Sequence, residues 1–146
     1  MSESFDFTEH PEYEAPFWDG ARQGKLLIQE CKDCGKRQFY PRLVCRHCQS
    51  RNLTWIESAG RGSIHSYTVV HRAPTEWQHL TPYAMIVVDL DEGARITSRI
   101  VVSPLASVAI GARVAARFEE VMPGVTMPVF AVTATEAAAN AGPAAA

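Results

Sequence analysis

Long apolar runs are missing from this sequence of 146 residues. The longest, such as residues 84–88, fall far short of the roughly 20 residues that a membrane-spanning helix needs. The N-terminus reads Met1-Ser2-Glu3-Ser4-Phe5-Asp6, which is acidic and has no apolar segment of the kind found in a signal peptide. We therefore expect a cytoplasmic protein with no membrane span.

A recognisable catalytic constellation is also missing. The sequence has no Ser–His–Asp ordering, no phosphate-binding glycine loop and no zinc-protease helix. His65 and His71 would share one face of a strand, but about 20 Å apart, too far to act on one atom. Asp89, Asp91 and Glu92 cluster at an expected hairpin, where acids are ordinary turn residues. We expect no catalytic residue in this chain.

Cysteine is scarce, and its four residues form a single pattern. Cys31-x2-Cys34 is followed, after ten residues, by Cys45-x2-Cys48. This spacing is typical of a tetrahedral four-cysteine zinc site of the zinc-ribbon kind. Four protein ligands leave no coordination position for water or substrate, so one bound zinc ion would be structural.

Other uses of four cysteines remain open at this point. Two disulfides would need an oxidising compartment, and a thioredoxin-like redox motif would explain one Cys-x-x-Cys pair but not two. An iron site or an iron–sulfur cluster accepts four thiolates as readily as zinc does. His47 lies between Cys45 and Cys48, and we interpret it as a turn residue, not a fifth ligand.

Charge is distributed unevenly along the chain. Residues 1–21 hold six acids and no Lys or Arg, whereas residues 22–51, here called the basic island, hold eight Lys or Arg against two acids. These positive charges would partly offset the net charge of −2 on a zinc ion with four thiolate ligands. They would equally suit an anion-binding face for the phosphates of nucleic acid or coenzyme A.

The N-terminal part predicts a helix followed by a ribbon. After a flexible segment (residues 1–13), Pro16 suits the first turn of a short helix and Gly24 suits the position just past its end. Phe17 and Ala21 share one face of that helix. Residues 14–59 are therefore expected to contain this helix and the zinc ribbon, with strands at 26–30, 38–40 and 53–57.

The C-terminal part predicts a small barrel, so the fold class is mainly β. Ser58-Ala59-Gly60-Arg61-Gly62 is expected to be a flexible boundary. Short strands at hairpin spacing follow at 63–72, 83–91, 94–102, 112–121 and 127–132. Five such strands predict a five-stranded OB-fold barrel over residues 60–132, with an SH3-like barrel as the nearest alternative. The Ala-rich tail, 133–146, is expected to be disordered.

Taken in order, several short motifs resemble a known family. They are Phe17-Trp18-Asp19-Gly20, the two cysteine pairs with Pro41-Arg42 between them, Gly60-Arg61-Gly62-Ser63-Ile64, Pro82-Tyr83, and the terminal Pro128-Val129-Phe130. The sequence is similar, over about residues 14–132, to the acyl-CoA-associated rubredoxin-type zinc ribbon plus OB-fold family, long catalogued as a domain of unknown function.

This resemblance implies a non-catalytic accessory subunit. Such subunits bind and stabilise a thiolase-like or sterol-carrier-type enzyme (thiolase, aldolase or lipid-transfer type) that acts on acyl-CoA thioesters. Within that interpretation, Arg37 and Arg42 would contact the phosphates of a CoA thioester at a shared interface. Phe17, Trp18 and Trp77 would anchor the interface, or else pack within the chain itself.

A single-stranded nucleic-acid-binding module is the alternative function, because zinc ribbons and OB-folds both occur in such proteins. The isoelectric point near 6.2 and the slightly acidic barrel half argue against it. The basic island lies on the expected ribbon, not on the barrel that would bind the strand.

Overall fold

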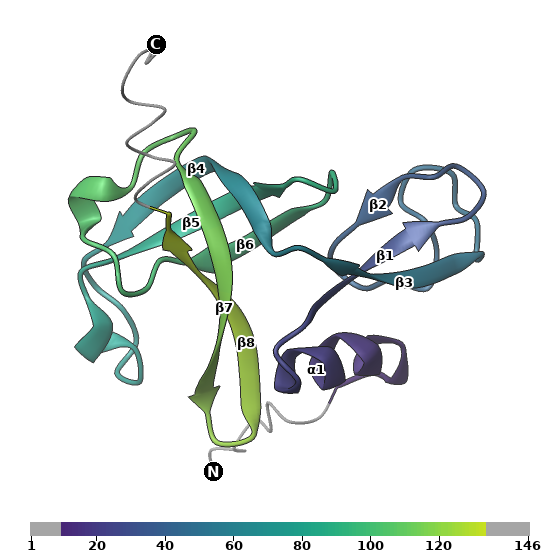
Figure 1. Cartoon of the computed structure of the whole chain (residues 1–146). Coiled ribbons are helices and arrows are strands. Elements are labelled where there is room, and N and C mark those ends of the chain that lie inside the picture. Colours follow the sequence, from purple (N-terminus) through teal and green to yellow (C-terminus); the bar gives the residue numbers. More distant parts are fainter. Residues whose placement is uncertain (1–9, 134–146) are drawn as a thin grey trace.

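The described chain begins with a 3-10 turn, η1 (Glu12–Glu14), and helix α1 (Ala15–Arg22), shown at the lower right of Figure 1. Gly24 follows with φ +76°, so the predicted helix end is confirmed. The computed structural model describes residues 10–133, and most of the two segments expected to be flexible, 1–13 and 133–146, lies outside them. No helix among the described residues is long and apolar enough to cross a membrane.

Three strands form the ribbon: β1 (Leu26–Cys31), β2 (Arg37–Gln38) and β3 (Leu53–Ser58). They pair antiparallel in the order β2-β1-β3. The second strand is shorter than the predicted 38–40, because Phe39 leaves the ladder and is buried against Phe17, with ring centroids 5.2 Å apart. The ribbon thus contributes an aromatic side chain to the surface on which α1 packs.

Five antiparallel strands form the barrel, as predicted: β4 (Arg61–Val70), β5 (Tyr83–Leu90), β6 (Arg95–Arg99), β7 (Arg113–Met122) and β8 (Val125–Val132). The order is β6-β5-β4-β7-β8, and a bridge between Ile100 and Phe130 brings the two ends of the sheet together. This Greek-key order, with the last two strands inserted between the first and the third, is that of an OB-fold. Two 3-10 turns, η2 (Gln78–Leu80) and η3 (Leu105–Ser107), lie in the connections.

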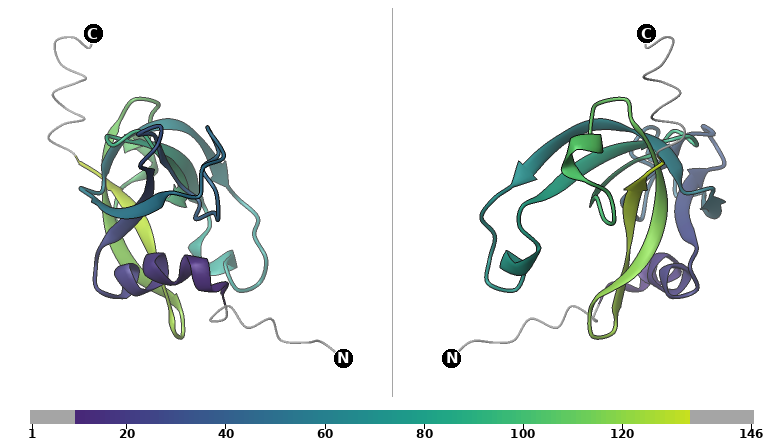
Figure 2. Two further views of the ribbon diagram at one scale, coloured as in Figure 1. Left: turned by 90° about the vertical axis from the view of Figure 1, so that its right-hand side faces the viewer. Right: turned by 60° about the vertical axis from the view of Figure 1, so that its left-hand side comes forward.

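The barrel is only partly closed. β4 pairs with β7 over three residues, Arg61 to Ser63, and then continues beside β5 alone toward the η2 loop. Figure 2 shows this β4–β5 arm and the β7–β8 hairpin diverging from the closed end. A bulge between Ile64 and Ser66 marks the place where β4 turns away.

One apolar core joins helix, ribbon and barrel. Phe17 from α1, Ile28 from β1, Ile64 from β4 and Phe130 from β8 belong to the same buried cluster. Helix α1 contacts both β1 and β8, so it fills the angle between the two sheets. A helix of eight residues is unstable alone, and this shared burial explains why it forms here.

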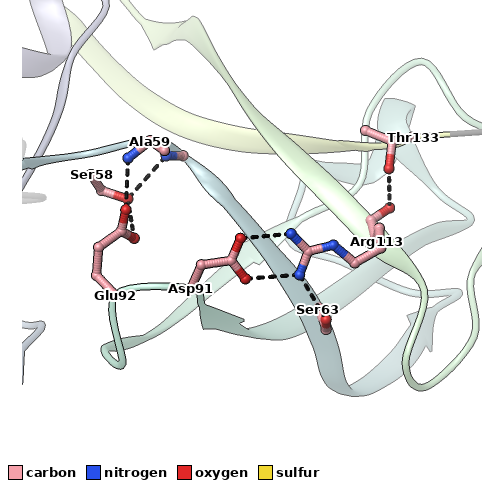
Figure 3. Close-up of polar contacts among 8 residues, drawn as sticks. Ser58, Ala59, Ser63, Asp91, Glu92, Arg113 and Thr133 are labelled. Carbon is pink, nitrogen blue, oxygen red and sulfur yellow. Dashed lines mark hydrogen bonds and ion pairs between the residues drawn. The ribbon is translucent and has the colours of Figure 1, made fainter. Parts of the chain in front are cut away.

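A turn carboxylate connects the barrel to the ribbon (Figure 3). Glu92, in the turn between β5 and β6, accepts hydrogen bonds from the Ser58 hydroxyl at 2.7 Å and the Ala59 N–H at 2.8 Å. Its backbone carbonyl accepts a further bond, at 3.1 Å, from the Arg37 guanidinium of β2. Residues 58–62 were expected to form a flexible boundary. Ser58, the last residue of β3, and Ala59, the next residue, are instead both hydrogen-bonded to the Glu92 carboxylate.

A second polar link closes the barrel next to that turn. The guanidinium of Arg113 donates two hydrogen bonds to the Asp91 carboxylate, at 2.8 and 2.6 Å, and a third to the Ser63 hydroxyl. Arg113 holds the pKa of Asp91 below its usual value, because these hydrogen bonds and the nearby positive charge favour the ionised carboxylate. β4, the β5–β6 turn and β7 are joined through this pair.

We expect Glu92→Ala to lower the free energy of unfolding by about 1 to 2 kcal/mol, because the buried Ser58 hydroxyl loses its acceptor. Chemical denaturation measures this change. Glu120→Ala is the matched control, since Glu120 is an exposed carboxylate for which the described structure gives no ion pair. Equal stability of the two variants would contradict the structural role of Glu92.

Candidate metal centre and basic island

Two similar turns present the four cysteines. In the first, residues 31–35, the Gly35 N–H donates to the Cys31 carbonyl at 2.9 Å; in the second, residues 45–49, the Gln49 N–H donates to the Cys45 carbonyl at 2.9 Å. Gly35 and Gln49 both adopt positive φ, at +74° and +63°. We call these turns the first and second knuckles. The repeated geometry aims two sulfurs from each knuckle at one point.

Backbone amides also point at two of the sulfurs. The Cys34 N–H donates to Cys31 Sγ at 3.5 Å, and the His47 N–H donates to Cys45 Sγ at 3.3 Å. Such bonds favour the thiolate over the thiol. Cys31 and Cys45 are buried, while Cys34 and Cys48 are exposed, so each knuckle contributes one inner and one outer sulfur.

The four sulfurs fit a tetrahedral metal shell. All lie within 4.8 Å of one another, with 3.5 Å between Cys31 and Cys48 and 3.7 Å between Cys34 and Cys45. Sulfurs at 2.3 Å from a central zinc would be about 3.8 Å apart. The pattern predicted from sequence is therefore brought together as one cluster, and a zinc ion held by the four residues fits it.

The four clustered thiols also influence one another's acidity. A backbone N–H from Cys48 is the main cause that lowers the pKa of Cys45, to about 6. A backbone N–H from Ser50 acts in the same direction on Cys48, but the neighbouring thiols outweigh it and raise the pKa of Cys48 to about 12. Four sulfurs this close cannot all ionise without a positive charge among them.

Two buried glutamines, which the sequence analysis did not identify, position the second knuckle. Gln38 donates from its amide to Gln29 at 2.8 Å and accepts from the Arg46 N–H at 2.8 Å. Gln29 accepts from the Arg42 N–H and donates to the Arg42 carbonyl, both at 2.9 Å. Strands β1 and β2 thereby hold the loop that carries Cys45 and Cys48.

The basic island does not gather its predicted phosphate ligands at one point. Arg37 is half-buried, and its Nε donates to Glu30 at 2.8 Å. Arg42 is exposed and lies on the loop whose backbone bonds the Gln29 side chain. It does not line the cavity that Arg37 lines.

The three candidate interface aromatics divide between two roles. Phe17 is buried in the core, so it packs within the chain. Trp18 is half-buried, donates from its indole N–H to Glu14 at 3.2 Å, and stacks on His10. Trp77 instead lines a surface depression on the barrel.

That depression, here called the apolar groove, has a volume of about 260 Å³. Its lining includes Trp77 and Tyr83 from the β4–β5 arm and Met85, Met127 and Pro128 from the sheet. Met85 and Met127 are 39% and 36% exposed. The groove lies between the arm and the β7–β8 hairpin that Figure 2 shows diverging.

The strand histidines do not form a site together. His65 contacts the Asp89 carboxylate at 3.3 Å, while His71 is exposed beyond the end of β4. The β4 bulge between Ile64 and Ser66 also breaks the strict alternation that had placed these side chains on one face.

The fold and the cysteine cluster define a zinc-ribbon and OB-fold protein. Two family models match it: "ChsH2, rubredoxin-like zinc ribbon domain" over residues 18–54 and "ChsH2, C-terminal OB-fold domain" over residues 55–119. The chain belongs to this family, also called DUF35, as the motifs indicated. The two models meet inside β3, and the boundary at residues 59/60 stays a prediction.

Similar proteins carry two kinds of name. A "DUF35 domain-containing scaffold protein" of Methanocaldococcus jannaschii is 37% identical over 97 residues, which are 66% of this chain and 69% of that protein. A "probable enoyl-CoA hydratase alpha subunit" of Thermomonospora curvata is 35% identical over 115 residues, 78% of this chain. The matched part is only 36% of the hydratase subunit's length.

A solved structure described as "Ltp2-ChsH2(DUF35) aldolase" has the same architecture. Its matching chain superposes with a TM-score of 0.74 and 31% sequence identity. The match covers 84% of this chain and 96% of the other. The likeness therefore extends over helix, ribbon and barrel together.

We expect the purified protein to contain one zinc ion per chain and to lose thermal stability when a chelator removes it, because four uncompensated sulfurs remain. Elemental mass spectrometry and thermal denaturation measure the two quantities. His47→Ala is expected to keep the full zinc content, whereas Cys45→Ser is expected to lose it. Iron in place of zinc, or a metal-free protein with disulfides, would contradict this assignment.

Gln38→Leu should destabilise the second knuckle, because the backbone N–H of Arg46 and the side-chain oxygen of Gln29 would both lose a buried partner. We expect about 2 kcal/mol or more of lost stability and faster zinc transfer to a chelator. Gln23→Leu, at an exposed position just past α1, is the control. Unchanged zinc transfer in Gln38→Leu would show that the knuckle does not depend on Gln38.

Proposed function

We propose that this protein is a non-catalytic accessory subunit that binds and stabilises a thiolase-like or sterol-carrier-type enzyme acting on acyl-CoA thioesters. The main support is the similarity to the ChsH2(DUF35) aldolase chain over nearly its whole length. The names of the other relatives, a scaffold protein and a CoA-hydratase subunit, support an enzyme-associated role in acyl-CoA chemistry.

The apolar groove is the surface that we propose for the enzyme partner. Trp77, Tyr83 and two partly exposed methionines, Met85 and Met127, give it the composition of a protein interface core. The only arginine in its lining, Arg99, is paired with Glu119 at 2.9 Å and has a side chain 14% exposed. A partner can therefore cover the groove without burying an unpaired charge.

The same lining disfavours the nucleic-acid alternative. An OB-fold that binds single strands presents a basic groove with aromatic platforms. Here the apolar groove lies on the barrel, and Arg99 in its lining is paired with Glu119. None of the Lys or Arg residues of the basic island lines the groove.

The zinc ion and the CoA thioester have different roles in the proposed function. The four-cysteine zinc site would be a structural element that keeps the ribbon folded, and its reduced thiolates suit the cytoplasm. Arg37 and Arg42 would contact the phosphates of a CoA thioester bound at the interface with the partner.

Co-expression with a thiolase-like enzyme of the same organism tests the proposal. We expect the two chains to co-purify, and Trp77→Ser or Met127→Ser to weaken the complex by about 30-fold, since each removes about 2 kcal/mol of anchoring contact. Ile110→Ser is the matched control, because Ile110 is 71% exposed and lies outside the groove.

Binding by calorimetry and thermal stability of each variant separate docking from folding. The proposal fails if this protein stays monomeric beside the enzyme while the enzyme alone is fully soluble and active. A complex that survives both groove substitutions would place the interface elsewhere on the chain.

A further inference from the structure

A polar cavity lies between the ribbon and the barrel, apart from the apolar groove. It has a volume of about 190 Å³ and is bounded by β2, the second knuckle and the β5–β6 hairpin. Three arginines line it, each from a different segment: Arg37, Arg46 and Arg95. We call it the junction cavity.

Positive charge is in excess around this cavity. Asp89 is the only carboxylate in its lining, and it is engaged by the Arg95 Nε at 2.6 Å. Arg37 is paired with Glu30, which lies outside the lining. For the Arg46 side chain, the described part of the structure gives no acidic partner within ion-pair distance.

Two of the three arginine side chains, those of Arg37 and Arg95, are held in place before any ligand arrives, and Arg46 is held through its backbone. Arg37 is fixed by Glu30 and by the carbonyl of Glu92. Arg95 is fixed by Asp89, and the backbone N–H of Arg46 is fixed by Gln38. A guanidinium has five N–H donors, so each of these three arginines keeps donors that these contacts do not use. Preorganised donors reduce the entropy lost on binding an anion.

We propose that the junction cavity binds a phosphate group of a phosphate ester. A phosphate group offers several terminal oxygens and up to two negative charges, which suit bidentate bonds from more than one guanidinium. A volume of 190 Å³ is below the range of pockets that enclose a whole small molecule. The cavity would therefore hold one phosphate while the rest of the ester extends outside.

The proposed function supplies the choice of ester, and the inference rests on it to that extent. CoA carries a 3′-phosphate and a diphosphate, and either presents the required chemistry. Free inorganic phosphate presents it too. Arg46 and Arg95 would then be anion ligands that the sequence did not single out, beside Arg37, which it did.

Binding to the isolated, zinc-loaded full chain tests this inference without the enzyme partner. CoA, dephospho-CoA and inorganic phosphate are titrated in turn by calorimetry at low ionic strength. We expect Arg46→Gln to weaken CoA binding about tenfold, the loss of roughly one charge-assisted hydrogen bond. Arg51→Gln, an exposed arginine of the basic island outside the cavity, is expected to leave binding unchanged.

The probes distinguish the sources of phosphate. Weaker binding of dephospho-CoA than of CoA assigns the 3′-phosphate, equal binding assigns the diphosphate, and inorganic phosphate as tight as CoA assigns the free anion. Each of these results supports phosphate binding in the junction cavity, provided that Arg46→Gln weakens the binding of the same probe. Zinc content and melting temperature of Arg46→Gln show whether the knuckle is intact, and Arg95→Gln gives a second variant on the opposite wall.

Three outcomes would overturn the inference. They are the absence of saturable binding of any probe, equal weakening by Arg46→Gln and Arg51→Gln, and tighter, Arg46-dependent binding of a single-stranded oligonucleotide than of CoA. Co-purification with the enzyme reports separately on the proposed function. If Arg46→Gln forms the complex normally, the proposed accessory function stands whatever the phosphate result. If the protein binds phosphate but forms no complex, the inference about the junction cavity stands and the proposed function fails.

Discussion

Glu92 provides the contact on which the arrangement of ribbon and barrel depends. From one turn of the barrel it bonds the end of β3 through its carboxylate and β2 through its carbonyl. Only two residues separate β3 from β4, so without such a contact the two sheets would be joined by a short segment containing Gly60 at φ +73°. The core shared by α1, β1 and β8 adds apolar burial to this polar link.

The ribbon combines a metal cluster with an internal polar frame. Four cysteines supply the sulfurs, but Gln29 and Gln38 hold the loop between the knuckles through its backbone. Asp33 of the first knuckle also accepts hydrogen bonds from Ser50 and Asn52, just past the second, and these bonds lower its pKa. These hydrogen bonds give the buried glutamine side chains partners and restrain the loop in addition to the metal ligands.

Two surfaces of different chemistry follow from this arrangement. The apolar groove lies on the barrel between the β4–β5 arm and the β7–β8 hairpin, and the junction cavity lies between barrel and ribbon. An accessory subunit that docks through the first and holds a phosphate through the second would use both of its modules.

The sequence by itself determined the local features: the helix end at Gly24, five barrel strands and the cysteine pairs, because turn residues, alternation and ligand spacing act over a few neighbours. The tertiary structure decided what depends on distant segments. Phe17 is a core residue because its helix packs on β1 and β8 and its ring meets that of Phe39. Arg42 is held at the backbone by the Gln29 side chain and does not line the cavity that Arg37 lines. Arg46 and Arg95, 49 positions apart in the sequence, meet only because Glu92 fixes the ribbon against the barrel.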